Sequence, residues 1–159
     1  MNNKEENDKF AIISAYMNST LENDHFPKSV FKFCKDRGIK EKSFYKFFGS
    51  LDGVKEMIWE TFYDNATSLL EKDDNFEGAR PKEKLLSFYF TFFEVLSLNR
   101  SYVLFALSGS RNMIFKMKQL SSLKKIFKTF SAELIEDGNL EKPSYLQHPP
   151  KIFSEAAWV

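Results

Sequence analysis

Residues 38–54 read Gly-Ile-Lys-Glu-Lys-Ser-Phe-Tyr-Lys-Phe-Phe-Gly-Ser-Leu-Asp-Gly-Val, and this stretch is the strongest indication of the fold. Gly38 stands where a preceding helix would end, because glycine adopts the left-handed conformation of a helix C-terminus at little cost. After a turn over residues 39–41, a second short helix is predicted over 42–48. Its inward-facing side would be formed by Phe44, Phe47 and Phe48.

The residues before Gly38 predict the first of the two helices. Segment 30–37 carries apolar side chains on one helical face, namely Val30, Phe33 and Cys34. Residues 26–29, Phe-Pro-Lys-Ser, would form the turn that enters it. Two short helices joined by a glycine-containing turn are the arrangement of a helix-turn-helix, so the segment predicts that motif.

The rest of the chain continues the helical pattern in both directions. Apolar residues at helical spacing predict further helices over 10–21, 51–72, 84–98 and 112–136, while 102–107 is expected to be a short buried segment and 73–80 a loop. The apolar face of the first of these helices would be Phe10, Ile13, Met17 and Leu21. The apolar stripe of the last would be Met113, Met117, Leu120, Leu123, Phe127, Phe130 and Leu134. Ser50 is expected to cap the helix that begins at Leu51. No alternation of period two persists, so we expect an all-α protein. Its parts would be a polar tail over 1–8, a helix-turn-helix domain over 9–50 and a helical domain over 51–159. Residues 154–159 look like the first turn of a further helix, which predicts a longer functional chain.

Composition and charge narrow the class of protein. The 23 Lys and Arg against 22 Asp and Glu give a net charge of +1, which singles out no kind of partner. The 18 phenylalanines favour bulky helical packing over strands. One cysteine excludes an internal disulfide. The N-terminus has no signal-peptide pattern, and the longest mostly apolar stretch, 85–98, is shorter than the roughly 20 residues that span a bilayer. We therefore expect a soluble, cytoplasmic protein without membrane contact.

The stretch from Gly38 to Val54 resembles the N-terminal domain of the tetracycline repressor (TetR) family of bacterial regulators. That family has a glycine, a valine and a few polar residues, then Thr-Leu-Tyr-x-His-Phe, a turn, and an aliphatic residue that opens the next helix. Upstream, Ser29-Val30 and Phe33-Cys34 stand where the family has Ser/Thr-Val and Ile-Ala. The resemblance covers residues 10–65. Phe47 and Leu51 depart from it, since the family has a histidine and a lysine there.

The resemblance implies a transcriptional repressor that binds a double-stranded DNA operator as a homodimer. Residues 28–46 hold seven basic and two acidic side chains, a local charge of +5, which suits phosphate binding. The start of the second helix of such a motif enters the major groove, while flanking groups hold phosphates. Base edges would be read by Lys40, Glu41, Lys42 and Ser43. The DNA backbone would be held by Lys28, Ser29, Tyr45, Lys46 and Lys55.

In TetR-like proteins the later helices enclose a pocket for a small effector, and here aromatic and methionine side chains are candidate walls. The candidates are Trp59, Phe62, Tyr63, Phe88, Tyr89, Phe92, Phe93, Phe105, Met113 and Met117. Taken singly, each of them is expected to fill the core instead. Glu94 shares a helical face with Ser87 and Thr91, so it either meets solvent or anchors a ligand inside the pocket. The expected effector is small and apolar or aromatic.

No pattern in the sequence predicts catalysis. There is no nucleophile with a partnered base, no glycine-rich phosphate loop and no pair of carboxylates in an apolar setting. Cys34 lies at a core position without His or Cys at ligand spacing, so we expect a buried thiol, no metal site and no cofactor. An alternative is a small-molecule or lipid-binding protein that has this fold and no longer binds DNA. Phe47 and Leu51 favour that alternative, whereas the basic segment 28–46 favours the regulator.

Overall fold

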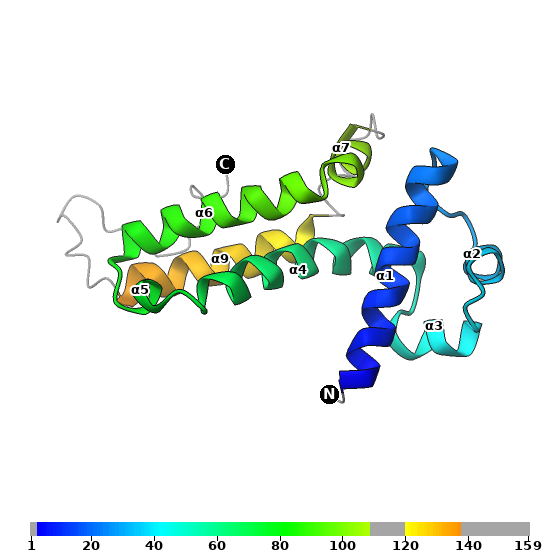
Figure 1. Ribbon diagram of the computed structural model, residues 1–159, viewed down its shortest axis with the longest axis horizontal. Helices are drawn as coiled ribbons and strands as arrows, with labels where there is room; N and C mark the ends of the chain where they lie inside the picture. Colours follow the sequence, from blue (N-terminus) through cyan, green and yellow to red (C-terminus); the bar gives the residue numbers. More distant parts are fainter. Residues whose placement is uncertain (1–2, 109–119, 138–159) are drawn as a thin grey trace. The chain divides into compact units, whose positions relative to one another are not determined.

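The structure, a computed structural model, describes residues 3–108 and 120–137. All regular elements of these residues are α-helices, which confirms the predicted fold class. They are α1 (Asn3–Asn23), α2 (Val30–Arg37), α3 (Glu41–Phe47), α4 (Leu51–Leu70), α5 (Asp74–Glu77), α6 (Pro81–Leu98), α7 (Arg100–Ser108) and α9 (Ser121–Asp137) (Figure 1). They fall into two compact units, which divide inside α4, between Ile58 and Trp59. The first unit includes α1 to α3 and α7, and the second includes α5, α6 and α9.

Short hydrogen bonds fix the helix ends around the α2–α3 turn. Gly38 has φ 65° and ψ 24°, and its N–H donates to the carbonyl oxygens of Cys34 and Lys35, as predicted for a left-handed cap. The Ser50 hydroxyl accepts from the Gly53 N–H at 3.1 Å and caps α4, also as predicted. At the start of α2, the Ser29 hydroxyl accepts from the N–H of Lys32. Backbone groups that lack a partner within their own helix are thereby satisfied.

Aromatic contacts join α1, α2 and α3 in the first unit. The ring of Tyr16 on α1 lies 5.7 Å from that of Phe33 on α2, and Phe33 lies 6.2 Å from Phe44 on α3. Phe44 in turn contacts Phe48, with ring centroids 5.7 Å apart. These four side chains are at most 3% exposed. Phe44 and Phe48 therefore form the inward side of α3 as predicted, whereas Phe47 is half-buried.

Helix α1 differs from its prediction in two ways. It begins at Asn3, so most of the expected polar tail is helical. Glu5 near its start is favourable beside a helix N-terminus and forms an ion pair with Lys46. Its buried face also differs, because α1 contacts α7 as well as α2. Phe10 and Leu21, predicted to face inward, are 38% and 40% exposed. The buried side chains are Ile12, Ile13, Tyr16, Ser19 and Thr20.

Helix α7 packs on α1 in the first unit, although it follows α6 directly in the chain. The predicted buried segment 102–107 is confirmed in part, since Tyr102, Val103 and Ala106 are buried. The ring of Phe105 meets that of Phe26 edge-on, at 5.2 Å. Tyr102 and Tyr16 each have a buried hydroxyl that makes no hydrogen bond with a described residue.

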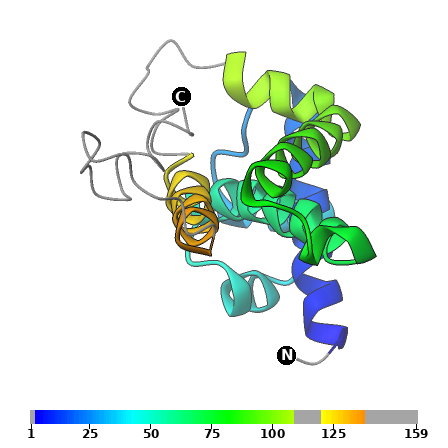
Figure 2. The same cartoon turned by 90° about the vertical axis from the view of Figure 1, so that its left-hand side faces the viewer.

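In the second unit, α6, α9 and the later part of α4 lie side by side (Figures 1 and 2). Phe88 on α6 is 1% exposed and occupies the centre. Its ring lies 5.3 Å from Tyr63 on α4 and 5.6 and 4.9 Å from Phe127 and Phe130 on α9. The helix predicted over 112–136 is thus present as α9 from Ser121, and the earlier part of that prediction lies outside the described residues. Its predicted stripe is buried at Leu123, Phe127 and Leu134.

The segment predicted as a loop between α4 and α6 contains the short helix α5. The Asp73 carboxylate accepts from the Asn75 N–H at 3.0 Å, which caps this helix. None of the helices within residues 3–108 and 120–137 combines the length and the apolar character needed to cross a bilayer.

Candidate functional site

The residues predicted to read base edges lie at the start of α3, and all of them are exposed. Lys40 is the N-cap of α3, and Glu41, Lys42 and Ser43 form its first turn. The Lys40 carbonyl accepts from the N–H groups of Ser43 and Phe44 at 2.8 and 3.1 Å, so this turn is regularly hydrogen-bonded. Because Phe44 is fully buried, α3 is anchored on one side while its first polar turn stays in solvent.

The flanking residues predicted to hold the DNA backbone are, with one exception, also on the surface. Lys28, Ser29, Tyr45 and Lys46 are exposed. Tyr45 is 55% exposed and its ring meets Phe44 edge-on at 5.5 Å, which restricts its position on the surface of α3. Eight of the nine predicted residues therefore lie on α3 or in the turns that enter α2 and α3.

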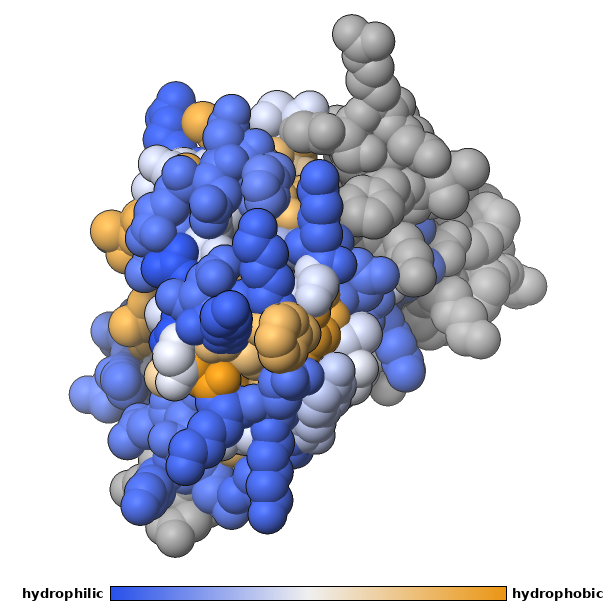
Figure 3. Space-filling view, turned by 90° about the vertical axis from the view of Figure 1, so that its right-hand side faces the viewer, coloured by the Kyte–Doolittle hydropathy of each residue, from blue (hydrophilic) through white to orange (hydrophobic). Residues whose placement is uncertain are grey.

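The charge of this surface is only partly neutralised within the protein. Arg37 pairs with Glu22 and Lys46 pairs with Glu5, so both contribute to holding α1 against α2 and α3. The remaining basic side chains are exposed and form no ion pair with a residue that the structure describes: they are Lys28, Lys32, Lys35, Lys40 and Lys42. Figure 3, which looks from the side of α2 and α3, shows hydrophilic side chains around a smaller hydrophobic patch.

Lys55, the ninth predicted DNA contact, is a correction to the sequence interpretation. Only 8% of this residue is exposed. Its Nζ lies 2.9 Å from Oδ1 of Asp52 and 4.8 Å from the centre of the Phe26 ring. A nearly buried ammonium is stabilised by such a carboxylate and by the face of an aromatic ring. Lys55 therefore has a structural role in the first unit, and we exclude it from the DNA-contacting set.

The predicted pocket walls on α4 and at the centre of α6 mainly fill the core. Trp59, Phe62, Tyr63 and Phe88 are at most 9% exposed. Trp59 and Phe62 contact one another edge-on at 5.8 Å, and Tyr63 and Phe88 belong to the aromatic centre of the second unit. Packing in the core thus explains where most of these side chains lie.

The other predicted pocket residues have different surroundings. Tyr89 and Phe92 are half-buried. Phe93 and Glu94 are exposed, so Glu94 corresponds to the alternative in which it meets solvent. Phe105 belongs to the first unit, where it packs on Phe26. The predictions for Met113 and Met117 lie outside the described residues.

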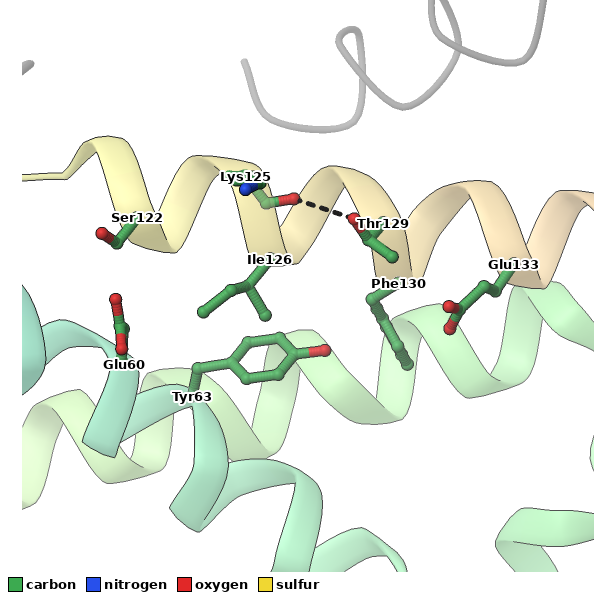
Figure 4. Close-up of a pocket in the computed structure, with 8 residues that line it drawn as sticks. All are labelled: Glu60, Tyr63, Ser122, Lys125, Ile126, Thr129, Phe130 and Glu133. Atoms are coloured by element: carbon green, nitrogen blue, oxygen red, sulfur yellow. Dashed lines mark hydrogen bonds between the residues drawn. The ribbon is translucent and has the colours of Figure 1, made fainter.

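A groove of about 380 Å³ lies between α4 and α9 in the second unit (Figure 4). This volume is within the range of small-molecule sites. Its lining residues are Glu60 and Tyr63 from α4 and Ser122, Lys125, Ile126, Thr129, Phe130 and Glu133 from α9. Only Tyr63 was among the predicted wall residues. The α9 residues flank the predicted apolar stripe of that helix, and of them only Phe130 belonged to the stripe.

Aromatic rings form the middle of the groove. The rings of Tyr63 and Phe130 lie 6.2 Å apart in an edge-on arrangement. Burial, together with the nearby Glu133 and Asp64 carboxylates, raises the pKa of Tyr63 to about 12. Its phenol is therefore neutral at physiological pH and keeps its proton for hydrogen bonding.

The structure shows no metal-binding cluster among residues 3–108 and 120–137. No group of His, Cys, Asp and Glu side chains there could hold a metal ion. Cys34 is 1% exposed, which confirms the expected buried thiol. Burial, and to a lesser degree Glu41, raises the pKa of this thiol, so it is a poor nucleophile.

Residues 84–159 match the family model of the tetracyclin repressor-like C-terminal domain. This part of the chain is therefore similar to the C-terminal domain of TetR-family regulators. The matched segment contains α7, α9 and most of α6, hence one wall of the groove, and it is distinct from the stretch around Gly38 that resembles the N-terminal domain of TetR regulators. No curated protein and no solved structure matches the chain. The exposed surface of α2 and α3 and the groove between α4 and α9 are the two candidate sites.

Proposed function

We propose that this protein is a TetR-family regulator and acts as a one-component transcriptional repressor in the bacterial cytoplasm. It binds a double-stranded DNA operator through α2 and α3, and a small-molecule effector releases it. The observation that carries the proposal is the α2–α3 surface, where five exposed lysines lie on and beside the polar, accessible first turn of α3 and form no ion pair with a described residue. The function is binding rather than catalysis.

The side chains at the start of α3 have the chemistry needed to read bases. A lysine donates to O6 and N7 of guanine, so Lys40 and Lys42 would select guanine. The Glu41 carboxylate accepts from the amino group of cytosine. Ser43 adds a hydroxyl that can both donate and accept a hydrogen bond. Lys28 and its neighbouring lysines on α2 would neutralise phosphates and set the position of α3 in the major groove.

Homodimerisation and effector response complete the proposal. One α3 contacts few base pairs, so two copies would bind half-sites separated by one helical turn of DNA or a multiple of it. Helix α4 runs from the first unit into the second, where it forms a wall of the groove. A ligand that binds better to one position of α4 would shift the population towards that position and alter the separation of the two α3 helices.

Selection of genomic DNA fragments by the purified protein at physiological salt tests this proposal. The wild-type protein should recover fragments that share a palindromic sequence. The double variant Lys40→Ala/Lys42→Ala should lose that recovery, because both lysines lie at the start of α3. Lys72→Ala/Lys82→Ala is the matched control, since these two lysines are exposed and belong to the second unit. Equal recovery by both variants would contradict the assignment of α3 as the reading helix.

The second candidate is a binding protein with this fold that has lost DNA recognition. Two observations favour it: Lys55 is nearly buried, and Phe47 and Leu51 are half-buried apolar residues at positions where TetR regulators have polar ones. Native mass spectrometry of the same preparation distinguishes the two. A co-purified lipid together with no recovered DNA would support this candidate against the repressor.

A further inference from the structure

The groove between α4 and α9 carries an excess of negative charge. Glu60 and Glu133 contribute two carboxylates, and Lys125 contributes one ammonium. Neither carboxylate forms an ion pair with a residue in the described part of the chain. In Figure 4, Glu60 lies at one end of the groove and Glu133 at the other. Both ends therefore present a negative group that no basic residue within 3–108 and 120–137 neutralises through an ion pair.

An aromatic and aliphatic surface connects these two ends. Figure 4 shows Tyr63, Ile126 and Phe130 between the two glutamates. Tyr63 is only 9% exposed, and its hydroxyl makes no hydrogen bond with any described residue although it reaches the groove. The face of an aromatic ring attracts a cation, and the attraction increases where water is excluded. The middle of the groove thus suits the apolar body of a ligand, and its rings add to the attraction for positive charge.

The charge pattern discriminates between classes of ligand. An anion would approach two carboxylates with only one ammonium to offset them. A neutral apolar molecule would cover the glutamates without replacing the water that solvates them, which is unfavourable. A cation avoids both penalties, since it supplies the missing counter-charge.

We propose that this groove binds an organic cation with an aromatic body, whose charged centre lies beside Glu60 or Glu133 and whose rings pack on Tyr63 and Phe130. The inference rests on the proposed function in one respect only: it takes this cation to be the effector. It changes the ligand class expected from the sequence, since the ligand carries charge as well as aromatic surface.

Calorimetric titration without DNA tests the proposal, using tetraphenylphosphonium and tetraphenylborate, which share a shape and differ in the sign of their charge. The wild-type protein should bind the cation and show no measurable binding of the anion. Glu60→Gln and Glu133→Gln should each raise the Kd for the cation roughly threefold to tenfold, and the double variant should raise it further. Glu71→Gln is the matched control: this exposed glutamate follows α4 outside the groove, so its Kd should stay within about twofold of wild type.

Several results would overturn the proposal. They are equal binding of the two ions, no binding of the cation by the wild-type protein, or an unchanged Kd in the double glutamine variant. Far-UV circular dichroism checks that each variant is folded. DNA release is measured in a separate experiment. Binding of the cation without DNA release would contradict its role as effector, whereas a protein that binds the cation and no DNA at all would contradict the repressor and leave the chemistry of the groove intact.

Discussion

Replacement of Gly38 by alanine tests how the α2–α3 turn is held. Gly38 has φ 65°, a conformation in which a Cβ costs about 1–2 kcal/mol. A Cβ at this position would meet no heavy atom within 4 Å, so no clash with neighbouring residues adds to that cost. Alanine also restricts the unfolded chain, which offsets about 0.4–1 kcal/mol. We therefore expect Gly38→Ala to lower the free energy of unfolding by about 1 kcal/mol.

Gly78 provides a matched control at the end of another helix. It is the C-cap of α5 with φ −81°, in the right-handed region, and a Cβ there would also meet nothing within 4 Å. Gly78→Ala should therefore stabilise the protein by about 0.4–1 kcal/mol through the unfolded chain alone. Asparagine tolerates the left-handed conformation better than alanine does, so Gly38→Asn should lie between wild type and Gly38→Ala.

Urea unfolding followed by far-UV circular dichroism measures these differences, and hydrogen exchange locates them. Faster exchange should be confined to the amides of α2, α3 and the turn between them in Gly38→Ala. If Gly38→Ala and Gly78→Ala changed the unfolding free energy equally, the left-handed cap would not be what holds the turn, and the reasoning would be refuted.

Three further predictions concern buried groups. Because the Tyr102 hydroxyl is buried without a hydrogen bond to a described residue, Tyr102→Phe should leave the unfolding free energy unchanged or raise it by about 1 kcal/mol in urea titrations; a loss of that size would mean that the hydroxyl has a partner. The pKa of Tyr63 is raised from 10.0 to about 12, so the stability it contributes is complete below pH 10 and lost as the pH rises towards 12. The difference in tyrosinate absorbance between the wild-type protein and Tyr63→Phe, followed against pH, measures the pKa of Tyr63. A titration midpoint near pH 10 would contradict the raised pKa. Lys55→Met should lower the unfolding free energy by about 1 kcal/mol, since it removes the contacts with Asp52 and Phe26. It should not alter the salt dependence of DNA binding, and a reduced dependence would return Lys55 to the DNA-contacting set.

The parts of the fold that depend on local chemistry could be predicted from the sequence. Helix α2 has the predicted bounds because the Ser29 cap, the apolar spacing and Gly38 all act within a few residues. The face of α1 could not be predicted in the same way. It depends on α7, a helix that comes nearly 80 residues later in the chain and covers part of α1.

The candidate sites show the same difference between features set by neighbouring residues and features set by packing between helices. The exposed residues at the start of α3 follow from the helix-turn-helix pattern itself. Burial of Lys55 does not, because it requires Asp52 and the Phe26 ring to meet on one side of α4. The groove was missed since it forms where α4 and α9 pack together, and its glutamates lie beside the apolar stripe that the periodicity identifies.

The salt dependence of affinity for the selected DNA tests the central claim most directly. Binding through exposed lysines releases counterions, so the logarithm of the association constant should fall linearly and steeply with the logarithm of the salt concentration. Lys28→Ala should reduce the slope by about one unit, while Lys82→Ala, a lysine of the second unit, should leave it unchanged. An affinity that does not vary with salt, or the same slope for wild type and Lys28→Ala, would contradict DNA binding by this surface.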